Sequence, residues 1–394
     1  MMVPKLRFPE FRELWKANRL GVISDSISSG KDKSDSDGKY DLYGSTGVIG
    51  KTSSDTYSGQ LILVARVGAN AGLLTRANGN FGVTDNTLVI HLKNSFQINF
   101  IFYYLERLDL NSLVFGSGQP LITGKQLKSL LLFLPDSSEQ QKIADCLTSI
   151  DDRITAETQK LDSLKAHKKG LMQQLFPAEG QTQPKLRFPE FHDNPKWEKK
   201  KLGDMILKSF YGTSSATSDT GKYPVLRMGD MSNGKLDFSN LVYITLDDSD
   251  FKRFSLKKGD ILLNRNNSYD LVGKVSIFES EIECLTASYI VTYRLNQSKL
   301  NPTFCNNLLN TSPYQNQIKT LATKSVSQAN INPTTFKEKV IIYLPKLDEQ
   351  KKNANCFASL DDLITAQTQE VEILKAHKKG LMQQLFPSLG EVKR

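Results

Sequence analysis

The sequence has few cysteines, no long hydrophobic run and no signal-like start, and each absence argues against a class of protein. Its four cysteines, Cys146, Cys284, Cys305 and Cys356, contain no CxxC spacing, which argues against a disulfide framework and a structural zinc site. No apolar run approaches the roughly 20 residues that cross a bilayer, and residues 1–11 lack the apolar core of a signal peptide. We therefore expect a cytoplasmic protein that does not enter a membrane.

The remaining composition is that of a globular protein. Of the 394 residues, 39% are hydrophobic and 24% are charged, and the length predicts two or three domains. The 51 basic and 42 acidic residues give a net charge of +9, which allows a nucleic-acid or acidic-surface partner without proving one. Residues 12–134 carry 13 basic and 10 acidic side chains, and residues 192–344 carry 20 and 15, so the excess lies in these two segments. We call them the variable middles.

Two strings occur twice in the chain. PKLRFPEF stands at Pro4–Phe11 and Pro184–Phe191, and KAHKKGLMQQLFP stands at Lys165–Pro177 and Lys375–Pro387. Identical runs of 8 and 13 residues show an internal duplication, whereas the variable middles between them differ almost everywhere. Duplication followed by drift alone does not explain why only the frames stayed identical. The pattern predicts two different recognition surfaces held in equivalent positions.

Each repeated tail predicts a long helix. From Glu139 to Phe176 the only glycine or proline is Gly170, and apolar residues recur at heptad spacing. Such a helix is about 55 Å long at 1.5 Å per residue. We expect the two helices to pair as a coiled coil; the alternative is an amphipathic helix packed on its own domain. The expected seam and subunit-interface residues are Ile143, Leu147, Ile150, Ile154, Leu161, Leu164, Leu171, Leu175, Phe357, Leu360, Ile364, Val371, Leu374, Leu381 and Leu385.

Polar residues interrupt this seam at matching places in the two copies. Glu157 corresponds to Gln367, and Lys168 corresponds to Lys378. Polar residues in a coiled-coil seam help to fix its register at some cost in stability. Asn353 stands where the first copy has Ile143, a departure that we expect to loosen that end of the second helix.

The variable middles contain similar elements in a similar order. After a turn-rich stretch at Ser24–Gly59, the first is expected to form strands and a helix at Leu61–Ala65, Thr87–Leu92, Phe100–Leu108 and Leu130–Leu134. The second gives comparable pieces at Tyr223–Met228, Gly259–Leu263, Tyr289–Leu295, Phe304–Leu309 and Val340–Leu344. We predict one α+β fold, used twice with different loops.

Catalytic motifs are weak. Gly44–Lys51 resembles a phosphate loop, but Ser45 stands where the first glycine is required, and the preceding Lys39–Tyr43 is a poor buried strand. Asp193 and Glu198 imitate the acidic pattern of metal-dependent nucleases at too short a spacing, and are better explained as part of a solvated segment. The glycine-rich loop and the Asn-Pro-Pro-aromatic site of a methyltransferase are missing. We expect no catalytic residue in this chain.

Neither the histidines nor the cysteines predict a metal site. His167 and His377 lie in the repeated KAHKKG block, where a histidine among lysines on a helix is usually exposed. Cys146 and Cys356 occupy equivalent positions beside the seam and are expected to pack as small hydrophobic residues.

Polar motifs that directly follow predicted strands favour DNA recognition. Arg66-Val-Gly-Ala-Asn70 follows one strand, Arg265-Asn-Asn-Ser268 follows the matching strand, and Gly116–Gln119 corresponds to Ser325–Gln328. Arginine reads guanine and asparagine reads adenine through paired hydrogen bonds, and small residues let a backbone approach phosphate. The alternative for any one of them is an ordinary exposed turn. The candidate DNA-binding residues are Lys51, Arg66, Asn70, Ser117, Gln119, Lys125, Arg227, Arg265, Asn266, Asn267, Lys274, Ser325 and Gln328.

Taken together, these features resemble the specificity subunit of a type I restriction–modification system over essentially the full length. The resemblance rests on the two variable domains alternating with near-identical helical tails. The strings that carry it are LPDSSEQQKIADCL and LPKLDEQKKNANCF before the helices, KKGLMQQLFP at their ends, and YGSTGVIG, ILVARVGANAG and GSGQPLIT in the first variable middle. The resemblance is specific as a whole, although each string alone is weak evidence for the family.

The resemblance implies an α+β fold with two globular target-recognition domains, separated by two long helices that pair as an antiparallel coiled coil with a pseudo-twofold internal repeat. The expected divisions are a first target-recognition domain with the N-terminal repeat segment at 1–136, a spacer helix at 137–177, a linker and repeat segment at 178–191, a second target-recognition domain at 192–346, a second spacer helix at 347–387 and a tail at 388–394.

The resemblance also implies a non-catalytic subunit that reads a bipartite target in double-stranded DNA, with half-sites about one helical turn apart. Two modification subunits would bind it and methylate adenine with S-adenosylmethionine, and restriction subunits would use ATP and Mg²⁺ to translocate and cleave. None of these cofactors is expected to bind this chain. The alternatives are a specificity subunit that serves modification only, a coiled-coil scaffold without DNA readout, and a stand-alone enzyme.

Overall fold

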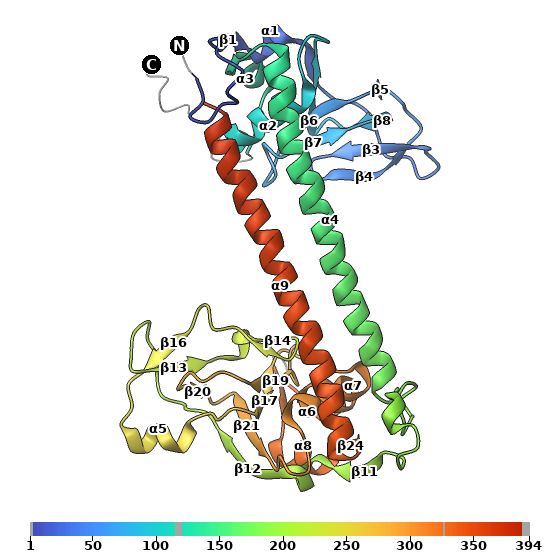
Figure 1. Ribbon diagram of the computed structural model, residues 1–394, viewed down its shortest axis with the longest axis vertical. Helices are drawn as coiled ribbons and strands as arrows, with labels where there is room; N and C mark the ends of the chain where they lie inside the picture. Colours follow the sequence, from blue (N-terminus) through green and yellow to red (C-terminus); the bar gives the residue numbers. More distant parts are fainter. Residues whose placement is uncertain (1–2, 115–119, 326–327, 388–394) are drawn as a thin grey trace. The chain divides into compact units, whose positions relative to one another are not determined.

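The computed structural model divides the chain into two units that share both long helices (Figure 1). The first unit is formed by Met1–Lys160 and Gln367–Arg394, and the second by Leu161–Ala366. Helix α4 (Ser137–Leu175) and helix α9 (Leu347–Leu385) each contribute residues to both units. The residues that the structure describes are 3–114, 120–325 and 328–387. Within this part of the chain, no helix is long and apolar enough to cross a membrane.

The first unit is built on two four-stranded sheets. Its strands are β1 (Lys16–Arg19), β2 (Ser24–Ser29), β3 (Tyr40–Gly44), β4 (Gly47–Thr52), β5 (Tyr57–Ser58), β6 (Leu61–Ala65), β7 (Leu74–Ala77), β8 (Asn80–Val83), β9 (Thr87–Leu92) and β10 (Leu131–Leu134). One sheet has the order β2-β9-β6-β7 and is antiparallel throughout. The other has the order β4-β3-β8-β5 and contains the parallel pair β3–β8. Strand β1 pairs with β10 beside them.

Helix α2 and the ends of both long helices cover the first sheet. The short helices of this unit are α1 (Leu20–Ile23), α2 (Ile98–Leu108), the 3-10 turn η1 (Leu110–Leu113) and α3 (Gly124–Ser129). Six consecutive residues of α2 are buried, which fits a helix that is apolar almost all round. Phe100 packs against Phe386 at the end of α9 with ring centroids 5.3 Å apart. The core therefore joins the variable middle to the repeated frame.

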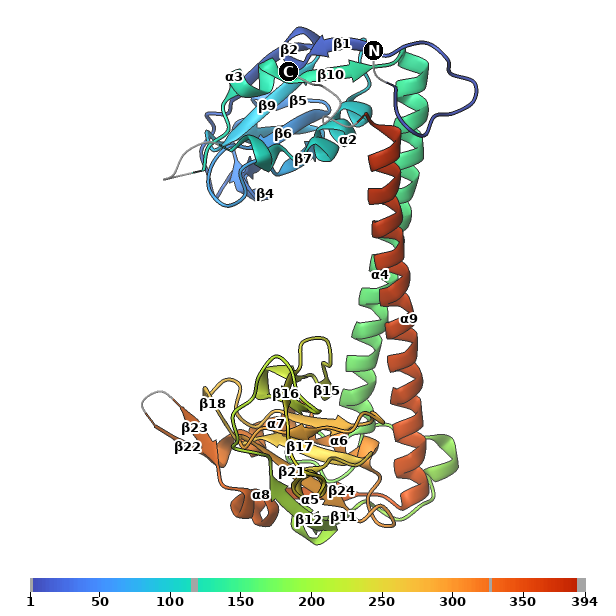
Figure 2. The same cartoon turned by 90° about the vertical axis from the view of Figure 1, so that its left-hand side faces the viewer.

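The second unit repeats this plan with different additions (Figure 2). Its strands are β11 (Glu198–Lys201), β12 (Ile206–Tyr211), β13 (Tyr223–Leu226), β14 (Met231–Ser232), β15 (Lys235–Leu236), β16 (Val242–Ile244), β17 (Asp260–Asn264), β18 (Asn266–Asn267), β19 (Val275–Phe278), β20 (Leu285–Thr286), β21 (Ile290–Leu295), β22 (Ala322–Lys324), β23 (Ala329–Ile331) and β24 (Ile341–Leu344). The sheet β12-β21-β17-β19 has the same pairing order as β2-β9-β6-β7. Its helices are α5 (Asp248–Phe254), α6 (Pro302–Leu309), α7 (Ser312–Thr320) and α8 (Pro333–Lys339).

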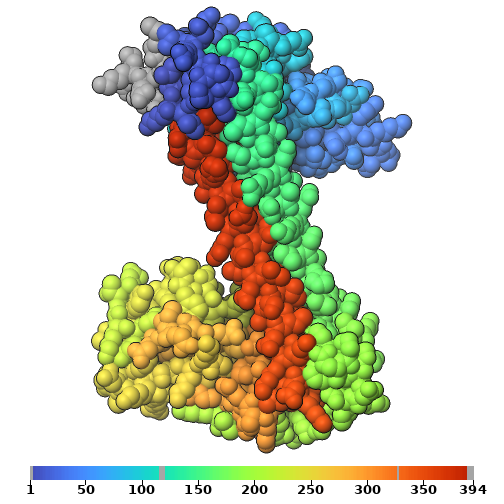
Figure 3. Space-filling view, in the orientation of Figure 1, coloured from blue at the N-terminus to red at the C-terminus, as the bar shows by residue number. Residues whose placement is uncertain are grey.

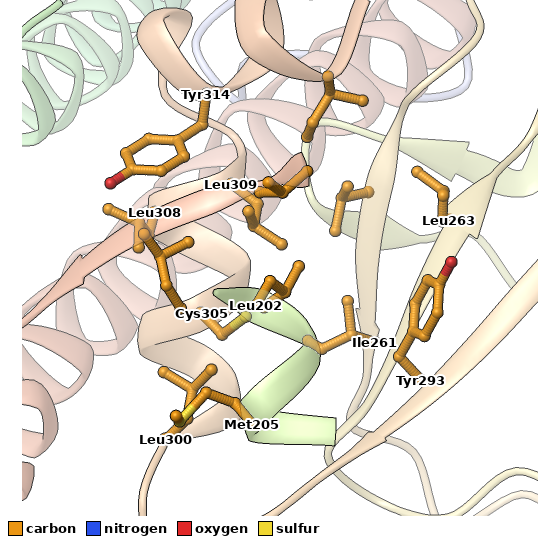
Figure 4. Close-up of a cluster of buried hydrophobic side chains, with 14 of the residues drawn as sticks. Leu202, Met205, Ile261, Leu263, Tyr293, Leu300, Cys305, Leu308, Leu309 and Tyr314 are labelled. Atoms are coloured by element: carbon orange, nitrogen blue, oxygen red, sulfur yellow. The ribbon is translucent and has the colours of Figure 1, made fainter. Parts of the chain in front are cut away.

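The core of the second unit lies between this sheet and α6 (Figure 4). Cys305 and Leu308 of α6 face Ile261 of β17 and Tyr293 of β21, and all four side chains are buried. Burial raises the pKa of the Cys305 thiol to about 12, so it stays protonated and packs as a small hydrophobic residue. The phenol of Tyr314 accepts a hydrogen bond from the backbone N–H of Tyr343.

The two long helices run antiparallel within each unit (Figure 3). In the first unit, Arg153 lies 3.0 Å from Glu370, and Lys378 lies 2.8 Å from Asp151. In the second unit, Lys168 lies 2.7 Å from Asp361, while the rings of Phe176 and Phe357 stack. Residue numbers rise along one helix as they fall along the other. The fold predicted from the sequence, an α+β domain with an antiparallel helix pair, is confirmed for each unit.

The seam residues are all buried or half-buried, but they divide into two kinds. Near the helix ends, Ile143 and Leu147 join the core of the first domain, and Leu175 and Phe357 join that of the second. In the middle of the helices, Leu161, Val371 and Leu374 are at most 7% exposed without belonging to either domain core. The heptad residues therefore pack on a domain core near the ends of the helices and on the partner helix in the middle.

Polar seam residues form the expected register contacts. Gln367 Nε2 donates to Glu157 Oε2 over 2.8 Å, so the two matching positions meet each other. This hydrogen bond lowers the pKa of Glu157. Asn353 is 2% exposed and its Oδ1 has no hydrogen-bond donor among the described residues. A polar side chain thus occupies a buried place that Ile143 fills in the first copy.

The expectation of a turn-rich stretch at Ser24–Gly59 was wrong. It contains β2, β3, β4 and β5, because backbone pairing with β9 and β8 holds strands whose side chains are mostly polar. Ile27 and Leu42 supply the inward apolar contacts. Lys39–Tyr43 was judged a poor buried strand; Tyr40–Gly44 does form β3, but only Leu42 and Gly44 of this strand are buried. Gly44–Lys51 lies in the β3–β4 hairpin, which is not the strand-to-helix turn of a phosphate loop.

The repeated octapeptide fastens the ends of both long helices. In the first unit, Arg7 forms two 2.7 Å hydrogen bonds to the buried Glu139 at the start of α4, and the N–H of Leu6 donates to the carbonyl of Gln384 at the end of α9. In the second unit, Arg187 pairs with buried Glu349 in the same way, and Leu186 donates to Gln174. The two repeated strings are therefore contact partners, which gives a physical reason for their joint repetition.

Candidate nucleic-acid interface

Two arginines leave the central strands of the two related sheets. Every residue of β6 and β17 is buried, so each strand is a rigid support for the residue that follows it. The N–H of Arg66 donates to the carbonyl of Asn86 over 2.8 Å, and that of Arg265 donates to Tyr289 over 3.0 Å. Both arginine side chains are half-buried, and neither Nε has an acceptor among the described residues.

The segments at Ile122 and Ile331 are hydrogen-bonded to the two arginines. The N–H of Ile122 donates to the carbonyl of Arg66 over 2.9 Å, and the N–H of Ile331 donates to that of Arg265 over 2.8 Å. Each arginine loop is thus joined to the segment that follows a serine- and glutamine-containing motif. Ser117 and Gln119, both predicted as DNA contacts, lie outside the described residues.

The other candidates of the first unit are distributed unevenly. Asn70 is exposed in the turn that follows Arg66, where its carbonyl accepts from Leu73. Lys125 is exposed in the first turn of α3, shortly after Ile122. Lys51 lies on β4 in the other sheet and forms a 2.8 Å ion pair with Asp41. Arg66 and Asn70 lie on one segment and Lys125 on another, which the Ile122–Arg66 hydrogen bond joins, whereas Lys51 lies in a separate sheet.

In the second unit, Arg265 lies in a cluster of polar and aromatic side chains. Its Nη1 donates to Asn330 Oδ1 over 2.9 Å, and its guanidinium carbon lies 5.0 Å from the centre of the Tyr211 ring. Asn266 and Asn267 form β18, which pairs with β23 and holds both residues beside the arginine. A guanidinium held by an amide and an aromatic ring is positioned before any ligand binds.

The remaining candidates of the second unit have mainly structural contacts. The Ser325 N–H donates to the Gln328 carbonyl over 2.7 Å, and both residues are exposed beside the β22–β23 hairpin. The carbonyl of Lys274 accepts from Asn264. Arg227 Nη2 donates to the carbonyl of Asn240 over 2.7 Å, which uses part of its guanidinium within its own loop. Ser325 and Gln328 therefore remain the more accessible of this group.

The sequence reasoning missed the tyrosines around Arg265. Tyr211, Tyr269 and Tyr289 are 40–48% exposed, and the Lys324 ammonium lies 3.6 Å from the centre of the Tyr269 ring. Exposed aromatic rings beside cations provide stacking and cation–π contacts for nucleic acids. Tyr289 stands immediately before β21, so its place at a strand end was the available signal. No spacing in the sequence marks the other two.

The residues considered for catalysis or metal binding have ordinary surroundings. Glu198 is exposed and pairs with Lys200 over 2.7 Å, as expected for a solvated strand. His167 and His377 are exposed on their helices. Over residues 3–114, 120–325 and 328–387, no group of three or more histidine, cysteine or acidic residues is arranged to hold a metal ion.

The chain is thus an internally duplicated protein, with two α+β domains that share a pair of repeated helices. A family model described as type I restriction modification DNA specificity domain matches residues 12–166 and again residues 194–375. The chain belongs to this family and contains two copies of its domain.

Curated relatives of the chain are described as specificity subunits of type I restriction enzymes. The chain is 33% identical over 193 residues to a putative type I restriction enzyme MjaX specificity subunit of Methanocaldococcus jannaschii, and this match covers 48% of the chain and 45% of that relative. It is 25% identical over 343 residues to the type I restriction enzyme MjaVIII specificity subunit of the same organism, covering 84% and 79%. The first match thus spans less than half of the relative, and the second spans most of it.

Solved structures share the fold at low sequence identity. A type I restriction-modification S subunit from M. genitalium superposes with a TM-score of 0.65 at 16% identity, covering 98% of this chain and all of the other. A chain from a structure that concerns complex assembly and conformational transition of the type I R-M system gives a TM-score of 0.56 at 14% identity, covering 96% and 98%. At this identity, the likeness supports the fold alone.

Proposed function

We propose that this chain is the DNA-reading subunit of a type I restriction–modification complex, in which each α+β domain reads one half of a bipartite target. The observation that carries the proposal is the matched pair of arginine loops, one after β6 and one after β17, joined by the same backbone hydrogen bonds to the segments at Ile122 and Ile331. Equivalent loops with unlike side chains suit two half-sites of different sequence.

Within this proposal, base contacts come from the arginine loops and phosphate contacts from their surroundings. Arg66 with Asn70, and Arg265 with Asn266 and Asn267, are the base-reading candidates because a rigid strand aims each group. The candidates for sugar and phosphate contacts, or for supporting the loops, are Lys51, Ser117, Gln119, Lys125, Arg227, Lys274, Ser325 and Gln328.

Catalysis and its cofactors then belong to other subunits. Two modification subunits would methylate adenine with S-adenosylmethionine, and restriction subunits would use ATP and Mg²⁺ to translocate and cleave DNA in the cytoplasm. The repeated frame supports this assignment, since two equivalent surfaces suit two copies of one partner. A complex that contains the modification subunits alone is the alternative within the same class.

The test is a map of methylated adenines by single-molecule sequencing, in cells with and without this gene. We expect a split motif with a fixed spacer to lose its methylation when the gene is deleted, and to regain it with the wild-type gene. An Arg66→Ala or Arg265→Ala gene should restore methylation with one half-site relaxed or with low occupancy. An unchanged methylation map on deletion would contradict the proposal.

A scaffold that does not read DNA is separated by a second measurement. Binding of the purified complex to a duplex that carries the mapped motif should fall steeply as salt rises, since phosphate contacts release counterions. It should also exceed binding to a duplex with one half-site scrambled. Equal binding to both duplexes would favour the scaffold.

A further inference from the structure

A cavity of about 690 Å³ lies in the second unit, beside the repeated basic string of α4. Lys165, Lys169 and Met172 of α4 line one side, and Asn307 of α6 and Pro313 of α7 line the other. This volume lies within the usual range of ligand-binding sites. The arginine loops described above do not contribute to it, so DNA reading does not account for it.

The charge of the cavity is positive. Its one carboxylate, Asp361, already binds Lys168 over 2.7 Å and Lys235 over 2.9 Å. Lys165 and Lys169 are exposed, and neither forms an ion pair within 4.0 Å among the described residues. Lys165 and Lys169 thus line the cavity without an acidic partner. The carboxylate of Asp361 in the same lining is shared by Lys168 and Lys235.

A buried amide in the cavity wall also lacks a partner. Asn306 donates to the carbonyl of Gly234 over 3.0 Å, and Asn310 donates to that of Val275 at the start of β19 over 3.2 Å, so both asparagines have backbone partners. Asn307 is 7% exposed, and its Nδ2 has no acceptor in the described part of the chain. An unpaired buried amide is unfavourable, and a ligand that supplied an acceptor would relieve it.

The first unit provides a matched comparison. The N–H of Gln97 donates to Gln140, and that of Asn301 donates to Gln350, so α2 and α6 begin at equivalent points of the frame. Counting from these points places Tyr103 where the second unit has Asn307. The Tyr103 side chain is fully buried, and its hydroxyl donates to Asp151 over 2.7 Å.

Two of the three matched lysines of the basic string have acidic partners in the first unit. Lys378, the counterpart of Lys168, binds Asp151 over 2.8 Å and Glu106 over 3.2 Å. Lys375, the counterpart of Lys165, binds Glu372 over 2.9 Å. The repeated lysines are therefore identical in sequence, but those of the second unit have fewer acidic partners.

We propose that the cavity of the second unit is a docking site for an acidic peptide segment of a partner protein. Carboxylates of the segment pair with Lys165 and Lys169, and a peptide carbonyl accepts from the Asn307 amide. Half-buried Met172 and Pro313 give the segment an apolar contact. A DNA backbone would supply anionic oxygens for the lysines but no apolar side chain for Met172 and Pro313. The matched lysines therefore act differently in the two units.

The test measures binding of the full chain to a short fluorescein-labelled peptide of alternating glutamate and leucine, by fluorescence anisotropy. Changing Lys165→Ala and Lys169→Ala together should weaken binding about tenfold, as expected for two lost charge-assisted contacts. The matched control, Lys375→Ala with Lys379→Ala, removes the same charges from the first unit and should leave the affinity unchanged. All four lysines are exposed, so both variants should retain the wild-type melting temperature.

A third variant, Asn307→Leu, keeps the size of the side chain and removes its amide, and should also weaken peptide binding. Absence of measurable peptide binding to the wild-type chain would overturn the proposal. Equal losses in the two lysine variants would overturn it as well, because they would show general attraction to basic helices. If the double lysine variant instead binds the peptide as before and loses affinity for a duplex of random sequence, that result would assign Lys165 and Lys169 to DNA.

Discussion

The two recognition domains share a central sheet of one strand order and differ in the side chains and additional elements placed around it. A Cβ on Gly30 would lie 2.0 Å from the carbonyl oxygen of Val83, and one on Gly212 would lie 2.0 Å from that of Thr286, so the backbone approaches its neighbour equally closely in the two domains. Beside these glycines, Ser29 stands in the first domain and Tyr211 in the second. Specificity can change at such positions without disturbing the hydrogen bonds that hold the loops.

The frame shows the reverse relation, because identical residues meet different surroundings. Glu139 and Glu349 are both buried and both bind an arginine of the octapeptide. Trp197 Nε1 additionally donates to Glu349 over 3.1 Å, whereas Trp15 Nε1 has no partner among the described residues. Identical frame residues therefore have different hydrogen-bond partners in the two units, and we expect the two units to differ in stability.

The largest effect is expected from removing the octapeptide arginines. Arg7→Ala leaves the carboxylate of Glu139 buried without its cation, and breaking such a pair costs about 3–5 kcal/mol. Arg187→Ala should cost less, because Trp197 still donates to Glu349. Urea unfolding of the two variants measures the difference. A larger loss for Arg187→Ala would contradict this assignment of the tryptophan contact.

The next effect concerns DNA affinity. Arg265→Ala should weaken binding to the mapped target by about 1–3 kcal/mol, the usual value of a paired contact to one base. Arg66→Ala should weaken it by a similar amount, and each change should relax a different half-site. Competition between duplexes altered in one half-site or the other measures this. If both variants relaxed the same half-site, the assignment of one domain to each half would fail.

A smaller effect is expected from Tyr211→Ser, which gives the second domain the residue of the first. The change removes the ring beside the Arg265 guanidinium, and an exposed cation–π contact contributes about 0.5–1 kcal/mol. Discrimination at the second half-site should fall, while the first half-site is read as before. The reciprocal change, Ser29→Tyr, is the matched control. Unaltered discrimination in Tyr211→Ser would show that the ring does not position Arg265.

The smallest effect belongs to the polar pair in the helix seam. The Glu157 pKa is lowered by the hydrogen bond from Gln367, so the ionised carboxylate stabilises the fold above its unfolded pKa. That contribution is lost as pH falls through the lowered pKa. Glu157→Gln should therefore remove a small part of the acid sensitivity. Urea midpoints measured as pH falls below neutrality test this, and parallel curves for the two proteins would argue against it.

Sequence reasoning succeeded where burial and periodicity agree. Leu61–Ala65 and Thr87–Leu92 are continuous apolar runs, and they form β6 and β9 with those bounds. The long helices were visible because heptad spacing extends without proline. Ser24–Ser29 was missed because five of its six side chains are polar and only pairing with β9 makes it a strand.

The candidate site was predictable only in part. Arg66 and Arg265 were identified because each follows a recognisable buried strand. Tyr211 and Asn330 lie far from Arg265 in sequence, and only the folded chain brings them beside it. The different environments of Lys168 and Lys378 were hidden for the same reason. Lys235 of one variable middle shares Asp361 with Lys168, whereas Glu106 of the other variable middle binds Lys378.

The central claim is that each variable middle reads its own half-site on a shared frame. The most direct measurement exchanges residues 12–134 and 192–344 between the two frames and maps methylated adenines by single-molecule sequencing. The ion pairs of Glu139 with Arg7 and of Glu349 with Arg187 lie outside the exchanged segments, so assembly should survive. We predict a methylated motif with its two half-sites in reversed order. Methylation of the original motif, or its complete loss in a protein that still assembles, would contradict the account.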